Sequence, residues 1–235
     1  MRSLADQDVR ELGGRLSVLH RQKQDHVELD ALLHELGRTP ADDQDEVLRR
    51  LYRLVFPHAF AEEAVLWPAL RRMLPDGEQI TLQIEQEHQE VNELVTSLEH
   101  LDAADPRRQP VLDRLVAVLR ADARDEEDVL LPRLQERAGS TRLRALGLAW
   151  EAVRQVAPTR AHPVVARRPP GNVLAALPLS LIDRLRDAVD AAQQRGPVRG
   201  STALAATSRG LTWLAHRVEQ LPPLTRGEDP STARH

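Results

Sequence analysis

Two segments of the chain repeat a pattern of acidic and imidazole side chains at helical spacing. HAFAEEAVLWP begins at His58, and DARDEEDVLLP begins 64 residues later, at Asp122. In each segment a glutamate follows the first residue by four positions, which gives the pairs His58 with Glu62 and Asp122 with Glu126. Residues four apart point the same way from an α-helix, so each pair can approach one site from one side. Imidazole and carboxylate groups of this kind bind divalent metals.

The apolar residues around these pairs predict four amphipathic helices. Leucine, valine and isoleucine recur at three- and four-residue steps in stretches that start near Leu12, Asp42, Glu78 and Leu112. Glycine and proline interrupt the pattern after each stretch. Each stretch carries one or two polar residues on its apolar stripe: His26, His58 with Glu62, His88, and Asp122 with Glu126. Helices joined by short connections predict an all-α, up-down-up-down four-helix bundle.

A metal site explains why polar residues occupy these inward positions. Unpaired imidazoles and carboxylates inside a bundle cost several kcal/mol each, so a cluster needs mutual neutralisation or a cation. A pair of divalent metals satisfies all of them. Glu62 and Glu126 repeat because the two oxygens of a carboxylate can bridge two metals, whereas a terminal ligand supplies one lone pair. The first position of the repeat can therefore differ, His58 in one copy and Asp122 in the other, and both copies can still contribute to a metal site.

At these positions the sequence resembles the haemerythrin-like, HHE cation-binding family, over roughly residues 14–137. The resemblance is carried by KQDH, HAFAEE, EQEH and DARDEEDVLLP. It implies a four-helix bundle with a non-haem centre of two iron ions, of the Fe–O–Fe type, that binds dioxygen, nitric oxide or peroxide, or senses iron. Carried over position by position, it implies as ligands His26, His58, Glu62, His88 and Glu126. The last histidine of the family pattern falls at Asp122.

Asp122 is where this chain departs from the family pattern. Aspartate reaches about 1 Å less far than histidine, so it binds a metal after a helix shift, binds through water, or leaves one metal under-coordinated. An asymmetric diiron site, a single metal and a mixed site such as Mn/Fe all remain open. With Asp122 as a ligand, the added anionic oxygen favours the ferric state. We therefore expect redox chemistry or sensing rather than oxygen transport.

Several other polar residues are secondary candidates. Glu85 precedes His88 by three positions, a spacing that carboxylate-bridged diiron helices use, and it is either an extra ligand or an outer carboxylate. Tyr52, the only tyrosine, lies near the metals or serves helix packing. Glu63 and Glu127 lie about 100° from the inward face, so we expect them to pair with arginines or to support the ligands.

The C-terminal part of the chain has a different character. We expect a metal-binding domain over residues 1–139 and an accessory helical region over 140–235. The accessory region should contain a helix capped by Ser140, a proline-rich connector at about 158–178, and helices from Leu179 to about Arg195 and from Thr202 to about Gln220. His162 then lies in a loop, and residues 221–235 form a loose tail. This region either packs around the bundle or forms an oligomer interface, so the sequence is compatible with a monomer and with a homodimer.

Composition narrows the classes of function. The chain of 235 residues has no cysteine, which excludes disulfides and thiolate metal sites. Its net charge of −4 gives no general attraction to nucleic acid or anionic membranes. The N-terminus lacks the apolar run of a signal peptide, and no apolar stretch is long enough to span a bilayer. We expect a cytoplasmic protein with a small ligand as its partner.

Three functional hypotheses follow from these patterns. The first is a diiron protein that reacts with or senses dioxygen, peroxide or nitric oxide, for example in stress defence. The second is a diiron oxidase or oxygenase that acts on an organic substrate in specialised metabolism. The third is a helical scaffold with a degenerate metal site that binds a partner. Enzymatic activity, such as peroxide consumption, is left open by the sequence.

Overall fold

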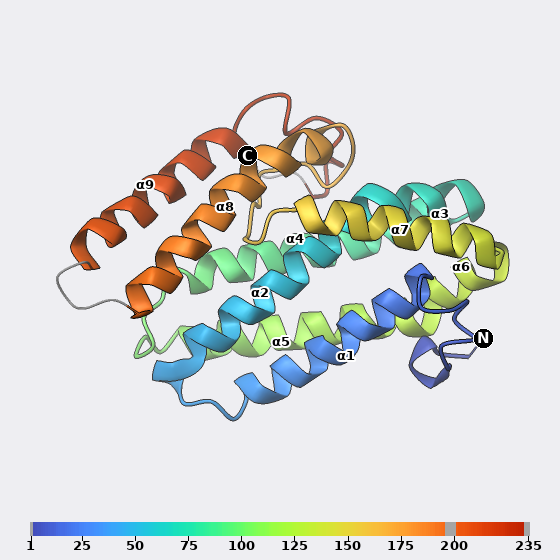
Figure 1. The fold of residues 1–235 in the computed structure, drawn as a ribbon, viewed down its shortest axis with the longest axis horizontal. Coiled ribbons are helices and arrows are strands. Elements are labelled where there is room, and N and C mark those ends of the chain that lie inside the picture. Colours follow the sequence, from blue (N-terminus) through green and yellow to red (C-terminus); the bar gives the residue numbers. More distant parts are fainter. Residues whose placement is uncertain (1, 196–200, 233–235) are drawn as a thin grey trace.

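The computed structural model describes residues 2–195 and 201–232, which form helices and turns without a strand. Four long helical segments run alongside one another and form the bundle (Figure 1). These segments are α1 (Val18–Leu36), α2 (Gln44–Ala61) continued by α3 (Trp67–Met73), α4 (Gly77–Leu98), and α5 (Arg108–Asp125) continued by α6 (Leu131–Arg137). The predicted all-α bundle is confirmed. In the described part of the chain, no helix combines the length and apolar character needed to cross a membrane.

A π-helical turn joins α2 to α3, and a second one joins α5 to α6. The turns span Glu62–Leu66 and Glu126–Leu130, and each begins at a glutamate of the repeated motif. The N–H of the residue after each turn donates to that glutamate's carbonyl, five residues back. The next residue is a proline in both copies, Pro68 and Pro132, and its lack of an N–H is tolerated where the ladder is already broken.

The π-turns change the phase of the helical segments that follow them. Pro57 lies inside α2, and the irregularity in that segment is the π-turn one turn later. A regular helical period would place Val129 on the same stripe as Glu126, whereas Val129 is 47% exposed and Leu130 is buried. The extra residue in a π-turn shifts the helical phase, so a 3.6-residue period extended past Glu126 faces the wrong way.

The first bundle helix begins later than its leucine pattern predicts. Gly13 and Gly14 have φ angles of 88° and 92°, in the left-handed region that favours glycine, and they place the preceding segment in turns. Ser17 then caps α1, because its hydroxyl accepts the backbone N–H of Leu19. Leu16, which directly precedes this cap, is therefore 51% exposed.

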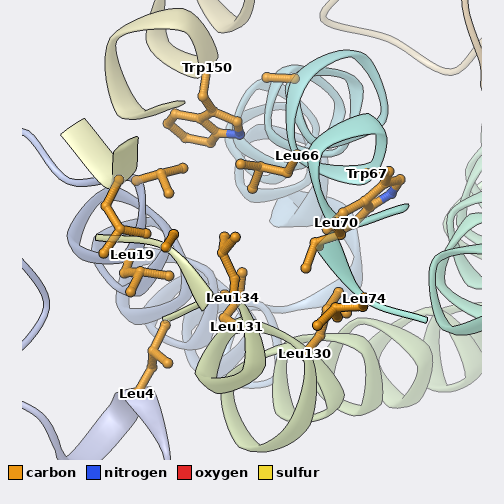
Figure 2. Close-up of a cluster of buried hydrophobic side chains, with 14 of the residues drawn as sticks. Leu4, Leu19, Leu66, Trp67, Leu70, Leu74, Leu130, Leu131, Leu134 and Trp150 are labelled. Atoms are coloured by element: carbon orange, nitrogen blue, oxygen red, sulfur yellow. The ribbon is translucent and has the colours of Figure 1, made fainter. Parts of the chain in front are cut away.

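Two apolar clusters fill the bundle on either side of its middle. The first, shown in Figure 2, contains Trp67, Leu70, Leu131 and Leu134 at the end where α3 and α6 lie. The second contains leucines and valines from the later part of α1 and α4 and from the earlier part of α2 and α5. On each of the four bundle segments, the predicted ligands lie in sequence between residues of one cluster and residues of the other. The bundle thus holds one polar layer between two apolar ones.

The C-terminal region packs against the outside of the bundle. Helix α7 (Ser140–Val156) contacts α1 and α2, and α8 (Gly171–Arg195) pairs with α9 (Ser201–Glu219) as a helical hairpin (Figure 1). Gly139 rather than Ser140 is the N-cap of α7. Helix α8 begins at residue 171, so the predicted connector over 158–178 is shorter than expected. Pro178 lies inside α8, on its exposed side, and does not end the helix.

The predicted loose tail is wrong over its described part. Residues 221–232 form turns in which Leu224 and Thr232 are buried. The carbonyl of Leu224 accepts the N–H of Ala166, and that of Arg226 accepts the N–H of Gly171. Residues 233–235 lie outside the described part of the chain. These bonds fix the tail against the connector and the start of α8.

His162, expected in a loop, is buried. It is 6% exposed, and its ring nitrogens lie 3.1 Å from Asp183 Oδ2 and 3.2 Å from Glu219 Oε2. Its backbone N–H donates to Asn92 on α4. His162 therefore joins α8, α9 and the bundle at one buried point.

Candidate metal centre

The structure brings the six predicted ligands together in the middle of the bundle. They come from all four bundle segments: His26 from α1, His58 and Glu62 from α2 and its π-turn, His88 from α4, and Asp122 and Glu126 from α5 and its π-turn. Glu62 and Glu126 are fully buried, and His26 and His88 are 8% and 4% exposed. A set of ligands that is far apart in sequence thus shares one buried layer.

The ligand atoms form two groups that share a glutamate. His26, His58 and Glu126 offer donor atoms that all lie within 4.8 Å of one another, and so do Glu62, His88 and Glu126. Glu62 also faces both groups, because its Oε1 lies 3.0 Å from His58 Nε2 and its Oε2 lies 3.6 Å from His88 Nε2. Each of the two glutamates therefore lies close to histidines of both groups.

Asp122 lies beside the second group. Its Oδ1 is 3.8 Å from His88 Nε2, and its side chain is 15% exposed. It belongs to neither three-residue group. The position expected to distinguish this chain from its family is thus at the edge of the site, next to a single histidine.

Each of the three histidines has a carboxylate on the far side of its ring. Glu127 lies 3.0 Å from Nδ1 of His26, Asp25 lies 3.0 Å from Nδ1 of His58, and Glu63 lies 2.9 Å from Nδ1 of His88. A carboxylate that accepts the Nδ1–H fixes the tautomer and leaves the Nε2 lone pair for a metal. In all three rings Nε2 is the nitrogen that faces the shared glutamates or Asp122.

Glu63 and Glu127 therefore contact the histidines of the candidate set, one of the two arrangements expected from the sequence. Asp25 was missed, although it directly precedes His26 in KQDH. Asp25 contacts His58, which lies on another helix, so the spacing of residues within α1 could not predict this contact. Aromatic rings complete the surroundings: Trp150 meets His58 edge-on at 5.5 Å, and Trp67 stacks on His88 at 6.3 Å, between ring centroids.

The inner carboxylates fit a bound cation. Among the described residues, neither oxygen of Glu62, neither oxygen of Glu126, nor Oδ1 of Asp122 has a partner in good hydrogen-bond geometry, although all five atoms are shielded from solvent. The nearest imidazole nitrogens, His58 Nε2 and His26 Nε2, lie 3.0 Å and 3.3 Å from one oxygen of Glu62 and of Glu126. Buried polar atoms without partners are rare in folded proteins and costly. Three imidazoles and three carboxylates, without thiolates, are a donor set suited to iron, manganese or zinc. The residues present therefore fit a metal centre.

Without a metal, protons must balance these charges. Burial alone would lower the pKa of His26, but Glu126 and Glu127 raise it to about 9. Burial likewise opposes the effect of Glu63 and Asp122 on His88, whose pKa rises to about 10. Burial and the charge of Glu126 raise the pKa of Glu62 and, more strongly, of Asp122. The metal-free site thus holds protons that a metal would displace.

The two secondary candidates lie away from the ligand groups. Glu85 is fully buried but forms ion pairs with Arg71 at 2.6 Å and Arg168 at 2.7 Å, so its charge is balanced without a metal. Tyr52 packs on Phe56 with ring centroids 5.9 Å apart, in the apolar cluster beyond the site. Burial raises the pKa of Tyr52 above its usual range. Neither residue joins the candidate centre in this structure.

Comparisons with known proteins agree with this geometry. The chain is 27% identical over 154 residues to an uncharacterized hemerythrin-like protein of Schizosaccharomyces pombe, an alignment that covers 64% of this chain and 76% of that protein. No solved structure matches the chain significantly. The family model described as the hemerythrin HHE cation binding domain matches residues 17–134, which hold all six ligand positions. The chain therefore belongs to the hemerythrin HHE cation-binding family.

Proposed function

We propose that this protein holds two iron ions between its four bundle helices and reacts with, or senses, dioxygen, peroxide or nitric oxide. The observation that carries this proposal is the pair of three-residue ligand groups joined by Glu126 and faced on both sides by Glu62. A site of one metal would not need two carboxylates in bridging positions. A ferrous pair, when bound, supplies two electrons to a small oxidant.

A small apolar cavity beside the ligands supports a small reactant. It measures about 30 Å³ and is lined by His58, His88 and Asp122 together with apolar residues such as Leu29 and Val91. This volume exceeds the roughly 10–15 Å³ that one water requires but is far below the several hundred Å³ of organic ligand sites. Dioxygen, peroxide and nitric oxide fit it. This cavity thus supports the first hypothesis, a reaction with a small molecule.

The residues of this chain would direct the reaction in defined ways. Asp25, Glu63 and Glu127 hold the histidine rings with Nε2 facing inward. The apolar wall of the cavity keeps bulk water from the ligands. Asp122 adds a third carboxylate, and anionic oxygen stabilises the ferric state. This balance favours oxidation or sensing over reversible oxygen carriage.

Metal analysis and anaerobic spectroscopy test the proposal. Wild-type protein loaded with Fe²⁺ without oxygen should bind about two ions per chain, and its absorption should change on addition of dioxygen, peroxide or nitric oxide. His26→Gln should lose metal, whereas His34→Gln, an exposed histidine on the same helix, should not. A wild-type chain that retains less than half an equivalent of any transition metal would refute the proposal and favour a degenerate scaffold.

A further inference from the structure

Two arginines of the C-terminal region reach the carboxylates that support the histidine ligands. Arg154 on α7 places Nη1 3.4 Å from Asp25 Oδ2, the oxygen that lies 3.0 Å from Nδ1 of His58. Arg167, in the connector before α8, places Nη1 3.9 Å from Glu63 Oε1, the oxygen that lies 2.9 Å from Nδ1 of His88. Each arginine is thus one carboxylate away from a candidate ligand.

Both guanidinium groups are held by other contacts. Arg154 lies over the ring of Trp150 at 5.2 Å, and that ring also meets His58. The guanidinium of Arg167 donates twice to the side-chain oxygen of Gln89 on α4, and the arginine is 8% exposed. Long side chains at a surface usually keep much rotational freedom. These two are fixed, so their charges act from defined places.

The third histidine has no such arginine. Glu127, the partner of His26, is 16% exposed, and within residues 2–195 and 201–232 no lysine or arginine lies within ion-pair distance of it. The C-terminal region therefore touches one histidine in each of the two ligand groups, His58 in the first and His88 in the second.

The charge of an arginine at this distance changes how strongly its carboxylate acts on the histidine. A carboxylate that accepts the Nδ1–H makes the imidazole a stronger donor to the metal. A guanidinium beside the same oxygen partly neutralises the negative charge of the carboxylate, so the carboxylate strengthens the imidazole as a donor less. Its own positive charge also disfavours further positive charge on the metal. Both effects have the same sign, and both stabilise the ferrous state relative to the ferric state.

We propose that Arg154 and Arg167 are positioning residues through which the C-terminal region sets the reduction potential of the metal centre. This inference rests on the proposed function, because it requires a redox-active metal at the six ligands. It assigns to the accessory region a chemical role at the site: α7 acts on one ligand group through Asp25, and the connector acts on the other through Glu63.

The test compares Arg154→Gln and Arg167→Gln with one control variant in the iron-loaded full chain. Arg217→Gln is the control for Arg154, because Arg217 also lies over a tryptophan, Trp213, at 5.8 Å, but that pair is on α9 away from the ligands. The midpoint potential is measured by spectroelectrochemistry, and the Fe²⁺ affinity by competition with a chelator.

Both test variants should shift the midpoint potential to lower values and speed the oxidation of the ferrous form, and the double variant should shift it further. Iron affinity should change less than about tenfold, whereas Asp25→Asn should weaken it by about 10- to 100-fold. Arg154→Lys should restore most of the potential. Arg217→Gln should leave both quantities unchanged.

The outcomes separate this inference from the proposed function. A wild-type chain that binds no iron overturns both. A wild-type chain that binds iron, together with test variants whose potentials equal that of Arg217→Gln, overturns only the inference. A fall in unfolding temperature in the test variants without a change in potential would mean that the arginines serve packing alone, and this also overturns it.

Discussion

Replacement of Asp122 by asparagine should have opposite effects on the metal-free and the metal-loaded protein. Oδ1 of Asp122 is shielded from solvent and accepts no hydrogen bond from the described residues. Burial and the neighbouring charge of Glu126 raise its pKa well above the usual value. A carboxyl whose pKa is higher in the folded state makes stability fall as pH rises above about 4. At neutral pH this carboxylate therefore destabilises the metal-free fold.

The size of the effect follows from the cost of an unpaired buried charge, which asparagine removes although its amide stays buried, about 1–3 kcal/mol. In a chain of this length, 1 kcal/mol corresponds to roughly 2–4 °C in unfolding temperature. Asp122→Asn should therefore raise the unfolding temperature of the metal-free protein by about 2–12 °C at pH 7.5, with a smaller gain at pH 5. Asp128→Asn, an exposed neighbour two residues after Glu126, is the matched control and should change little.

With metal, the same substitution removes a candidate ligand. An amide oxygen binds iron less well than a carboxylate, so affinity for the second ion should fall by more than about tenfold, or about 1.4 kcal/mol. Asp122→His, which restores the family pattern, should recover it. Calorimetric scans with and without Fe²⁺, and metal titration, measure both halves. If Asp122→Asn lowers the unfolding temperature without metal and leaves iron binding unchanged, Asp122 is a structural residue and the reasoning fails.

Three further predictions concern protons and packing. A metal must displace the protons of His26 and His88, whose pKa values are raised to about 9 and 10. The apparent iron affinity should therefore increase as pH rises from 6 toward 9, as a titration at several pH values would show. A flat profile would argue against these histidines as ligands. Against the opposing effect of burial, Asp183 and Glu219 raise the pKa of His162 to about 9. The proton of His162 therefore stabilises the fold fully below about pH 6.5, and this contribution of roughly 3 kcal/mol is lost as pH rises through 9. The metal-free His162→Gln variant should lose less unfolding free energy between about pH 6.5 and 9 than the metal-free wild type does. Gly147→Ala would place a Cβ 2.1 Å from the backbone oxygen of Leu16, so it should destabilise the packing of α7 by about 1–3 kcal/mol in urea unfolding, while Gly210→Ala, with no atom within 4 Å, should be neutral or slightly stabilising.

The sequence was sufficient to predict the bundle and the convergence of the six candidate ligands, because both depend on local periodicity. His58 and Glu62 lie on a stripe defined by their own helix, and the same holds for Asp122 and Glu126. Facing stripes must meet in a bundle, so the six residues could be predicted to converge. Their neighbours Glu63 and Glu127 could be expected near the site because they lie next to the ligands in the repeat.

Features that depend on contacts between distant segments could not be predicted in this way. Arg154 and Arg167 reach the site only because α7 and the connector pack on the bundle, and a surface arginine has the same pattern in sequence. His162 is buried by Asp183 and Glu219, which lie 21 and 57 residues away. Helix α8 continues through Pro178, a residue that usually ends a helix, because tertiary packing outweighs local propensity.

The two π-turns have a consequence for the length of the repeated motif. Each adds one residue to a helix, so the segment beyond it is turned by about 100° relative to an uninterrupted helix. Deletion of Ala64 would remove that extra residue together with the π-turn, so α2 would continue as a regular helix with His58 and Glu62 in place. Trp67 and Leu70, both fully buried, would keep facing the apolar cluster that they fill. A substitution that removed the π-turn at unchanged length would instead turn both side chains away from that cluster, so the extra residue and the π-turn must be kept or lost together.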